Sequence, residues 1–423
     1  MKLFGNAVIG QSGGPTAAIN ATLAGVIRGA MLSREIETVY GSINGLEGIL
    51  ENRLTELNGQ FQRKECFDLL IQTPAAALGS CRKKLKDPEE DPETFRLLFE
   101  RFRAANIRYF FYIGGNDSMD TVKKLSAFAS SGGSDWEMRF IGVPKTIDND
   151  LFGTDHTPGF GSAAKYIAVS VQEILRDCSV YTVPTVTIVE IMGRDAGWLT
   201  AAAALPGRIS GKAPDYLYFP ERSFSYDAFF GDLKEALSLH PNVVVAVSEG
   251  IRLSDGTYVG SGAQSGVADV FGHRYLAGTG KVLEGAVRET LGCKVRSVEL
   301  NILQRCAAHC ASKTDWDEAF SIGREAVTAA LDGGSGIMVG FCRESDNPYR
   351  VSVTSSDVSQ IANRIRCLPD EFINPSGNGV TEPCLDYLMP LIVGEPETVW
   401  RQGLPVHFAI DQSVFRPREE SKS

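Results

Sequence analysis

The chain has 423 residues, with 52 acidic and 42 basic side chains, a formal net charge of −10. Its 43% hydrophobic and 22% charged content is typical of a globular protein and excludes a disordered or collagen-like chain. The length favours two or three domains. The acidic balance argues against general binding to nucleic acid or anionic membranes. An anionic substrate would therefore need a local cluster of basic residues.

The cysteine and hydropathy patterns bear on the compartment. The nine Cys residues show no paired spacing, which favours reduced thiols. No apolar run approaches the roughly 18 residues that a membrane span requires. The N-terminal stretch also lacks the apolar run of a signal peptide. We therefore expect a cytoplasmic protein that binds neither nucleic acid nor a membrane.

Short apolar runs of strand character end in Gly-rich or polar turns, and a helix-like segment often follows. Such alternation predicts an α/β fold with mainly parallel sheets. The runs lie at 7–10, 108–113, 138–143, 185–191, 243–247 and 296–302. Ligands of parallel sheets bind beyond the carboxyl ends of the strands. Because the chemically unusual residues follow these ends, we expect them to converge on one crevice.

Two glycine pairs follow predicted strands and precede predicted helices: Gly13–Gly14 and Gly114–Gly115. Missing side chains let backbone N–H groups approach an anion, and a helix N-terminus favours negative charge. The two pairs together suggest a phosphate site, although glycine pairs also occur in ordinary tight turns. Neither pair fits a Walker loop or a dinucleotide-binding fingerprint.

The segment PKTIDND, residues 144–150, concentrates Lys145, Thr146, Asp148 and Asp150 after a strand. In extended backbone the two carboxylates would share a face. One could accept a hydroxyl proton while the other helps to hold Mg²⁺, and Lys145 could bind a phosphoryl oxygen. The alternative is a polar turn with capping carboxylates.

Further charged residues follow other strands. The segment GSCRKKLK, residues 79–86, is the expected basic cluster, in which Arg82 could stabilise a transferring phosphoryl group. Asn116 and Asp117 follow the second glycine pair, where a carboxylate beside a phosphate requires a balancing cation. A solvated basic loop and a helix N-cap are the respective alternatives.

In combination the ordered motifs resemble the phosphofructokinase family. They are SGG at 12–14, GSCR at 79–82, GGNDS at 114–118, PKTIDND at 144–150, MGR at 192–194, SEG at 248–250 and QR at 304–305. The resemblance spans roughly residues 1–310 and implies transfer of a phosphoryl group to the 1-hydroxyl of fructose 6-phosphate. The last ~110 residues carry less recognisable signal.

Two positions resemble the pyrophosphate-dependent branch of that family. Asp117 and Lys145 stand where ATP-dependent members typically carry Gly. Asp117 adds bulk and negative charge where the α-phosphate of a nucleotide would lie, which disfavours ATP, and Lys145 can neutralise pyrophosphate. The resemblance thus predicts reversible formation of fructose 1,6-bisphosphate and phosphate. An ATP-dependent phosphofructokinase and a catalytically silent sugar-phosphate-binding subunit are the alternatives.

The resemblance also implies a role for each site residue, with Asp148 as the general base. The other catalytic residues would be Lys145, Asp117 and Arg82. The donor would bind at Gly13, Gly14 and Gly115. The sugar phosphate would contact Thr146, Ile147, Asp148, Met192, Gly193, Arg194, Glu249, Arg296 and Arg305. The cofactor Mg²⁺ would be held at Asn116 and Asp150, with Asp117 as an alternative ligand.

The implied architecture is two doubly wound, mainly parallel-sheet (Rossmann-like) α/β domains with the active site in the cleft between them. Residues 1–161 plus about 304–355 would bind pyrophosphate, and 162–303 plus about 356–423 the sugar phosphate. A homodimer or homotetramer is expected. Thr185 and Ile302 stand where ATP-dependent bacterial members carry Arg and His, which leaves room for sedoheptulose 7-phosphate as a second acceptor.

Overall fold

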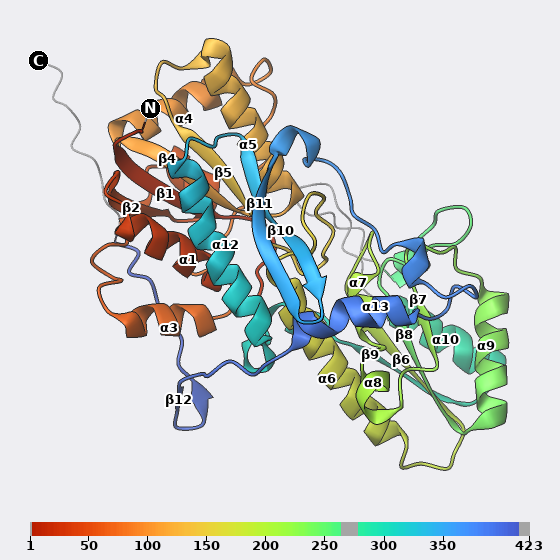
Figure 1. The fold of residues 1–423 in the computed structure, drawn as a ribbon. Coiled ribbons are helices and arrows are strands. Elements are labelled where there is room, and N and C mark those ends of the chain that lie inside the picture. Colours follow the sequence, from red (N-terminus) through yellow and green to blue (C-terminus); the bar gives the residue numbers. More distant parts are fainter. Residues whose placement is uncertain (1, 264–277, 414–423) are drawn as a thin grey trace, which may run out of the picture.

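The computed structural model describes residues 2–263 and 278–413. The chain forms two lobes, each built on a sheet with helices on both faces (Figure 1). One sheet is mixed but mainly parallel and the other is wholly parallel. The predicted α/β fold class is confirmed.

The first lobe contains a seven-stranded sheet. Its strands, in spatial order, are β11 (Tyr349–Asp357), β10 (Ile337–Asp346), β5 (Arg139–Pro144), β4 (Ile107–Gly114), β1 (Gly5–Gln11), β2 (Ile36–Ser42) and β3 (Leu54–Glu56). Only the outermost strand on each side is antiparallel to its neighbour. After β1 the chain adds β2 on one side and then β4 on the other. Ligand sites of such sheets lie where the strand order reverses, here beyond the ends of β1 and β4.

Helices cover both faces of this sheet because its buried strands are apolar on both sides. Ile9 and Phe111 face one helical layer, and Val8 and Phe110 face the other. The first layer is α1 (Ile19–Leu32), α3 (Lys64–Gln72) and α12 (Lys313–Leu331). The second layer is α2 (Gly45–Leu50), α4 (Pro92–Ala104) and α5 (Asn116–Phe128).

Helices α1 and α12 touch through their backbones. A Cβ atom on Gly25 would lie 2.1 Å from the carbonyl oxygen of Phe320, and one on Gly323 would lie 2.3 Å from that of Thr22. No side chain fits at such distances, so glycine allows the close helix crossing that fixes α12 on the sheet.

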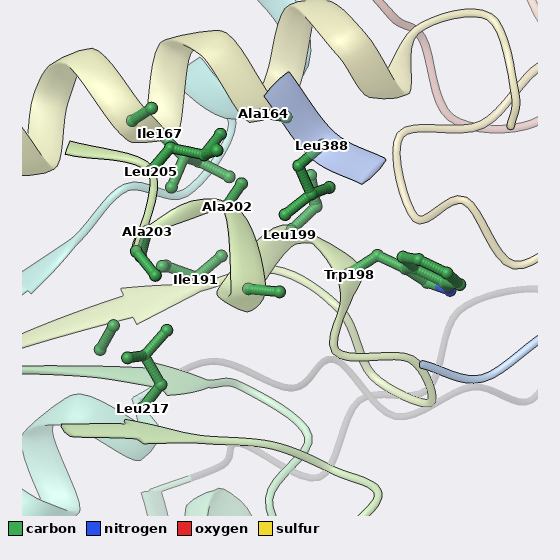
Figure 2. Close-up of a cluster of buried hydrophobic side chains, with 14 of the residues drawn as sticks. Ala164, Ile167, Ile191, Trp198, Leu199, Ala202, Ala203, Leu205, Leu217 and Leu388 are labelled. Atoms are coloured by element: carbon green, nitrogen blue, oxygen red, sulfur yellow. The ribbon is translucent and has the colours of Figure 1, made fainter. Parts of the chain in front are cut away.

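The second lobe contains a parallel sheet in the order β7 (Tyr216–Tyr218), β8 (Asn242–Ser248), β6 (Thr185–Ile191), β9 (Lys294–Glu299). On one face lie α6 (Phe160–Cys178), α7 (Trp198–Ala202), α8 (Pro206–Ser210) and α13 (Glu382–Leu388). On the other lie α9 (Tyr226–Leu239) and α10 (Thr279–Leu291). Figure 2 shows the first of these cores, where Ile191, Leu199 and Leu388 pack together with Ile167 of α6.

The chain crosses between the lobes several times (Figure 1). It enters the second lobe through α6 and returns after the short helix α11 (Leu303–Cys306) to form α12, β10 and β11. None of the helices within residues 2–263 and 278–413 is long and apolar enough to traverse a bilayer.

The end of the described chain departs from the predicted domain division. After α13 it forms the hairpin β12 (Trp400–Arg401) and β13 (Leu404–Pro405). The Gln72 amide on α3 donates to the carbonyl oxygens of Val399 and Val406, and Thr55 donates to that of Asp411. Residues 399–411 therefore lie on the first lobe, whereas the sequence analysis placed them in the second domain, because polar side chains of that lobe bind their backbone.

Candidate active site

The turn after β1 is joined to the basic loop. Gly13 has φ +78°, a conformation that favours glycine. Its N–H donates to the Cys81 carbonyl at 3.2 Å, and the Ser80 hydroxyl donates to the Gly13 carbonyl at 2.6 Å. The backbone of this loop therefore brings Arg82 beside the Gly13–Gly14 turn.

Two cationic side chains lie against the same turn. A Cβ atom on Gly13 would be 3.2 Å from Nζ of Lys145, and one on Gly14 would be 3.4 Å from Nη1 of Arg305. Lys145 is only 3% exposed and donates to the Gly14 carbonyl at 2.7 Å. Burial lowers its pKa to about 8, and the cations Arg305 and Arg82 act in the same direction. The turn is therefore surrounded by positive charge, as a phosphate site requires.

Two carboxylates stand on the loop that carries Lys145. The N–H of Asp148 donates to the Thr146 hydroxyl at 3.1 Å, which fixes the start of this loop. Burial raises the pKa of Asp148, although Lys145 and Arg194 act against that rise. Burial and repulsion from Asp148 raise the pKa of Asp150 to about 7. A carboxylate with a raised pKa, close to a candidate phosphate site, is suited to accept a proton.

The second lobe contributes the residues that follow β6 and β8. The N–H of Gly193 donates to Oε1 of Glu249 at 3.3 Å. Burial and the nearby Asp148 raise the pKa of Glu249 to about 8. The N–H of Met192 donates to the amide oxygen of Gln304 at 3.0 Å, which ties this loop to α11. Residues from both lobes thus meet around Asp148.

Arg296 does not join this group within one chain. It lies in β9 opposite Thr187, to whose hydroxyl it donates at 3.2 Å, and it pairs with Asp177 at 2.9 Å. Met192 lies five residues after Thr187, just beyond the end of β6, which is roughly 16 Å at the usual strand rise. Ile147 was also predicted to contact the sugar phosphate. Its side chain is 5% exposed and packs in the core of the second lobe.

Asn116, predicted as a metal ligand, has another role. Its Oδ1 accepts the N–H of Asn363 at 2.9 Å, and its Nδ2 donates to the Arg364 carbonyl at 2.7 Å. Both ends of the amide therefore hold the backbone of a distant segment. The neighbouring Asp117 faces the basic loop, where it pairs with Lys84 at 3.4 Å.

The residues present fit a divalent cation at Asp148 and Asp150. Across the described part of the chain, no three His, Cys, Asp or Glu side chains cluster as a protein-only metal site. Asp148 and Asp150 repel each other and have raised pKa values. A cation would stabilise their charged forms, and phosphate oxygens of a substrate could supply the remaining ligands.

The sequence analysis gave no role to Asn149 and Arg366, which support the Asp148 loop. Asn149 is fully buried with φ +55°, a conformation that Asn tolerates better than most residues. Its amide accepts from Thr157 N–H at 3.1 Å and donates to the Tyr387 hydroxyl at 3.1 Å. Arg366 donates to its carbonyl oxygen at 3.4 Å. The turn motif could have indicated Asn149, but two of its partners, Tyr387 and Arg366, lie more than 200 residues away in the chain.

Comparisons with known proteins agree with this geometry. The profile of the family described as "Phosphofructokinase" matches residues 6–330. The chain is 43% identical to a pyrophosphate--fructose 6-phosphate 1-phosphotransferase of Halomonas elongata, over 95% of this chain and 94% of that one. It is 42% identical to an enzyme of the same name from Methylococcus capsulatus, over 95% of this chain and 94% of that one.

A solved structure of a pyrophosphate-dependent phosphofructokinase from Nitrosospira multiformis superposes with a TM-score of 0.87. It is 36% identical in sequence, and the match covers 98% of each chain. The family profile includes the loops that follow β1, β4, β5, β6 and β8, and the relatives cover at least 95% of this chain. The chain therefore belongs to the phosphofructokinase family.

Proposed function

We propose that this protein transfers a phosphoryl group from pyrophosphate to the 1-hydroxyl of fructose 6-phosphate. The observation that carries this proposal is the buried ammonium of Lys145, held on the Gly13–Gly14 turn by the loop that also carries Asp148. Relatives named for this reaction cover nearly the whole chain. The reaction is reversible, because the phosphoester formed and the phosphoanhydride broken differ modestly in free energy.

The reaction begins at the sugar hydroxyl. The Asp148 carboxylate accepts the proton of the 1-hydroxyl, and the oxygen attacks the nearer phosphorus of pyrophosphate. The bond from that phosphorus to the bridging oxygen breaks, and inorganic phosphate leaves with the electron pair. In the reverse direction the protonated Asp148 returns its proton to the sugar oxygen.

Positively charged side chains stabilise the negative charge on the phosphoryl group and on the leaving phosphate during transfer. Lys145 and Arg82 flank the turn that would hold the donor, and they stabilise the equatorial oxygens and the departing phosphate. Asp117 pairs with Lys84 of the basic loop, the same loop that binds the Gly13 backbone, and would add bulk and negative charge on the donor side. A longer polyphosphate carrying a nucleoside would meet that carboxylate, which supports pyrophosphate as the donor.

The cofactor in this proposal is Mg²⁺, with Asp150 as its protein ligand. When bound, it neutralises donor oxygens and so favours attack on phosphorus. The raised pKa of Asp150 supports this assignment, since a nearby cation would offset the repulsion from Asp148.

The sugar phosphate would lie between the lobes. Arg194 and Glu249 would bind its hydroxyl groups, and Arg305 its 6-phosphate, with the backbone of Met192 and Gly193 beside them. Sedoheptulose 7-phosphate remains a second acceptor of similar chemistry. The proposal includes a cytoplasmic homodimer or homotetramer, in which Arg296 could serve a neighbouring chain.

Phosphorus NMR tests the reaction directly. Purified protein, Mg²⁺, fructose 6-phosphate and pyrophosphate should yield inorganic phosphate and a new sugar-phosphate resonance in equal amounts. Starting from fructose 1,6-bisphosphate and phosphate, pyrophosphate should appear. Release of two phosphates per pyrophosphate, with no sugar bisphosphate, would indicate a pyrophosphatase and overturn the proposal.

A further inference from the structure

A C-terminal segment, residues 363–368, runs beside the loops of the active site. Asn116 binds its first two residues through both ends of its amide. Ile365 then forms an antiparallel bridge with Leu151. At its far end the N–H of Leu368 donates to the Glu221 carboxylate at 2.8 Å. The segment therefore touches the donor-side helix, the Asp148 loop and the second lobe in turn.

Within this segment Arg366 holds the backbone that follows the general base. Its N–H donates to the Asp150 carbonyl at 2.8 Å. Its Nη1 donates to the Asn149 carbonyl at 3.4 Å. Two successive carbonyls after Asp148 thus have the same residue as partner, one through its backbone and one through its side chain.

The opposite side of Arg366 is fixed by the second lobe. The guanidinium carbon lies 4.2 Å from the ring centre of Trp198, and the indole N–H donates to the Arg366 carbonyl at 3.0 Å. Trp198 is fully buried at the start of α7, directly after the loop that carries Arg194. Arg366 is therefore packed between the loop of the base and the loop of the sugar site.

The chemistry of this contact requires arginine. In the part of the chain that the structure describes, no carboxylate lies within ion-pair distance of Arg366, so the contact is not a surface salt bridge. Its partners are a ring face, the Asn149 carbonyl and the Tyr387 hydroxyl at 3.4 Å. A planar guanidinium can stack on a ring and donate sideways at once, whereas an ammonium cannot.

We propose that Arg366 is a positioning residue that holds the Asp148 loop against Trp198 and so sets where the general base meets the sugar hydroxyl. This inference rests on the proposed role of Asp148. Arg366 itself touches neither substrate in this account. A small displacement of a catalytic group slows chemistry more than it weakens binding, so the effect should fall on kcat.

The first experiment compares variants of two arginines on the same segment. Arg366→Met should lower kcat about 10- to 100-fold with a much smaller change in KM for fructose 6-phosphate, and Arg366→Lys should recover little of it. The matched control is Arg364→Met, because Arg364 stacks on Phe152 further along the loop and donates to Gln360, and its side chain binds neither Asn149 nor Asp150. Unchanged kcat in both Arg366 variants would overturn the proposal.

A double-mutant comparison tests whether Arg366 acts through Asp148. In an Asp148→Asn background the further change Arg366→Met should reduce the residual rate by less than about twofold, since residues that act as a unit are not additive. A further loss as large as in the wild type would show an independent role and overturn the proposal.

Hydrogen exchange provides a readout that needs no turnover. Amide exchange over residues 148–151 should be faster in Arg366→Met and Arg366→Lys than in the wild type and in Arg364→Met. Unchanged exchange in folded Arg366 variants would overturn the proposed hold on the loop. If the wild type proved inactive with pyrophosphate, the proposed function would fail while exchange still decided whether Arg366 holds the loop.

Discussion

The ammonium of Lys145 donates a 2.7 Å hydrogen bond to the carbonyl oxygen of Gly14. A residue that follows β5 thereby closes against the turn that follows β1, two strands away across β4. The contact places a buried positive charge directly against the backbone of a glycine turn, because glycine has no side chain to separate them. It also fixes the loop whose next charged residue is Asp148. This relationship underlies the predictions on donor, base and metal.

Replacing the general base should abolish turnover and leave binding. Asp148→Asn should lower kcat about 10²- to 10⁴-fold, because the carboxylate proposed to accept the hydroxyl proton is lost. The dissociation constant for fructose 6-phosphate, measured by calorimetry, should change by less than about fivefold, or roughly 1 kcal/mol. Asp227→Asn, an exposed residue in the first turn of α9, is the matched control. Near-normal turnover by Asp148→Asn would contradict the assigned role.

The metal requirement should depend on Asp150 and not on Asn116. Asp150→Asn should raise the Mg²⁺ concentration for half-maximal rate by about tenfold or more. Asn116→Ala should leave that concentration unchanged and lower the free energy of unfolding by about 1 kcal/mol, because it removes two hydrogen bonds to residues 363–364. The opposite pattern in a magnesium titration would restore Asn116 as the ligand.

A buried histidine should make stability depend on alkaline pH. His156 lies between Asp155 at 2.8 Å and Glu318 at 2.7 Å. Arg343 also binds Asp155, and Tyr349 also binds Glu318. Burial alone would lower the pKa of His156, but the two carboxylates outweigh burial and raise the pKa to about 9.

Because the folded pKa exceeds the unfolded value, the stabilisation from His156 is complete below about pH 6.5 and is lost as pH rises through 9. Its size is on the order of 3 kcal/mol. Urea unfolding at pH 7 and pH 10 should show a larger loss for the wild type than for His156→Gln. Equal losses in the two proteins would contradict this account.

The contact between α1 and α12 should tolerate no methyl group. Gly25→Ala would place Cβ 2.1 Å from the Phe320 carbonyl oxygen, so it should destabilise the fold by about 3 kcal/mol or more. Gly231→Ala, in α9 with nothing within 4 Å of its Cβ, should instead stabilise by about 0.5–1 kcal/mol. Urea midpoints that move in the same direction for both would contradict the packing described.

The sequence alone predicted the parts of the site that follow strands. Gly13 and Lys145 follow buried strands of the first sheet, so parallel-sheet topology brings them to one edge, and Glu249 follows a buried strand of the second sheet at the corresponding edge. The α/β class, the family and its resemblance to pyrophosphate-dependent members were confirmed. The individual roles of the site residues stay predictions.

The remaining contacts could not be predicted because they depend on tertiary structure. Arg366 and Tyr387 reach the Asp148 loop from more than 200 residues away, and no local pattern records such a meeting. Asn116 is predicted as a metal ligand because it stands where ATP-dependent members carry a Mg²⁺-associated Asp, but the sequence does not show that its oxygen accepts a backbone N–H. The sequence around Arg296 has strand character, which the structure confirms. Arg296 lies near the start of β9, however, and the site lies beyond the other end of the strands.

The most direct measurement of the central claim is the ratio of kcat/KM for pyrophosphate to that for ATP, with fructose 6-phosphate and Mg²⁺, in the wild type and in the double variant Asp117→Gly, Lys145→Gly. The wild type should favour pyrophosphate by at least about 10²-fold, equivalent to roughly 2.7 kcal/mol. In the double variant the ratio should fall as pyrophosphate use declines and ATP use rises. A wild-type enzyme that prefers ATP would contradict the account.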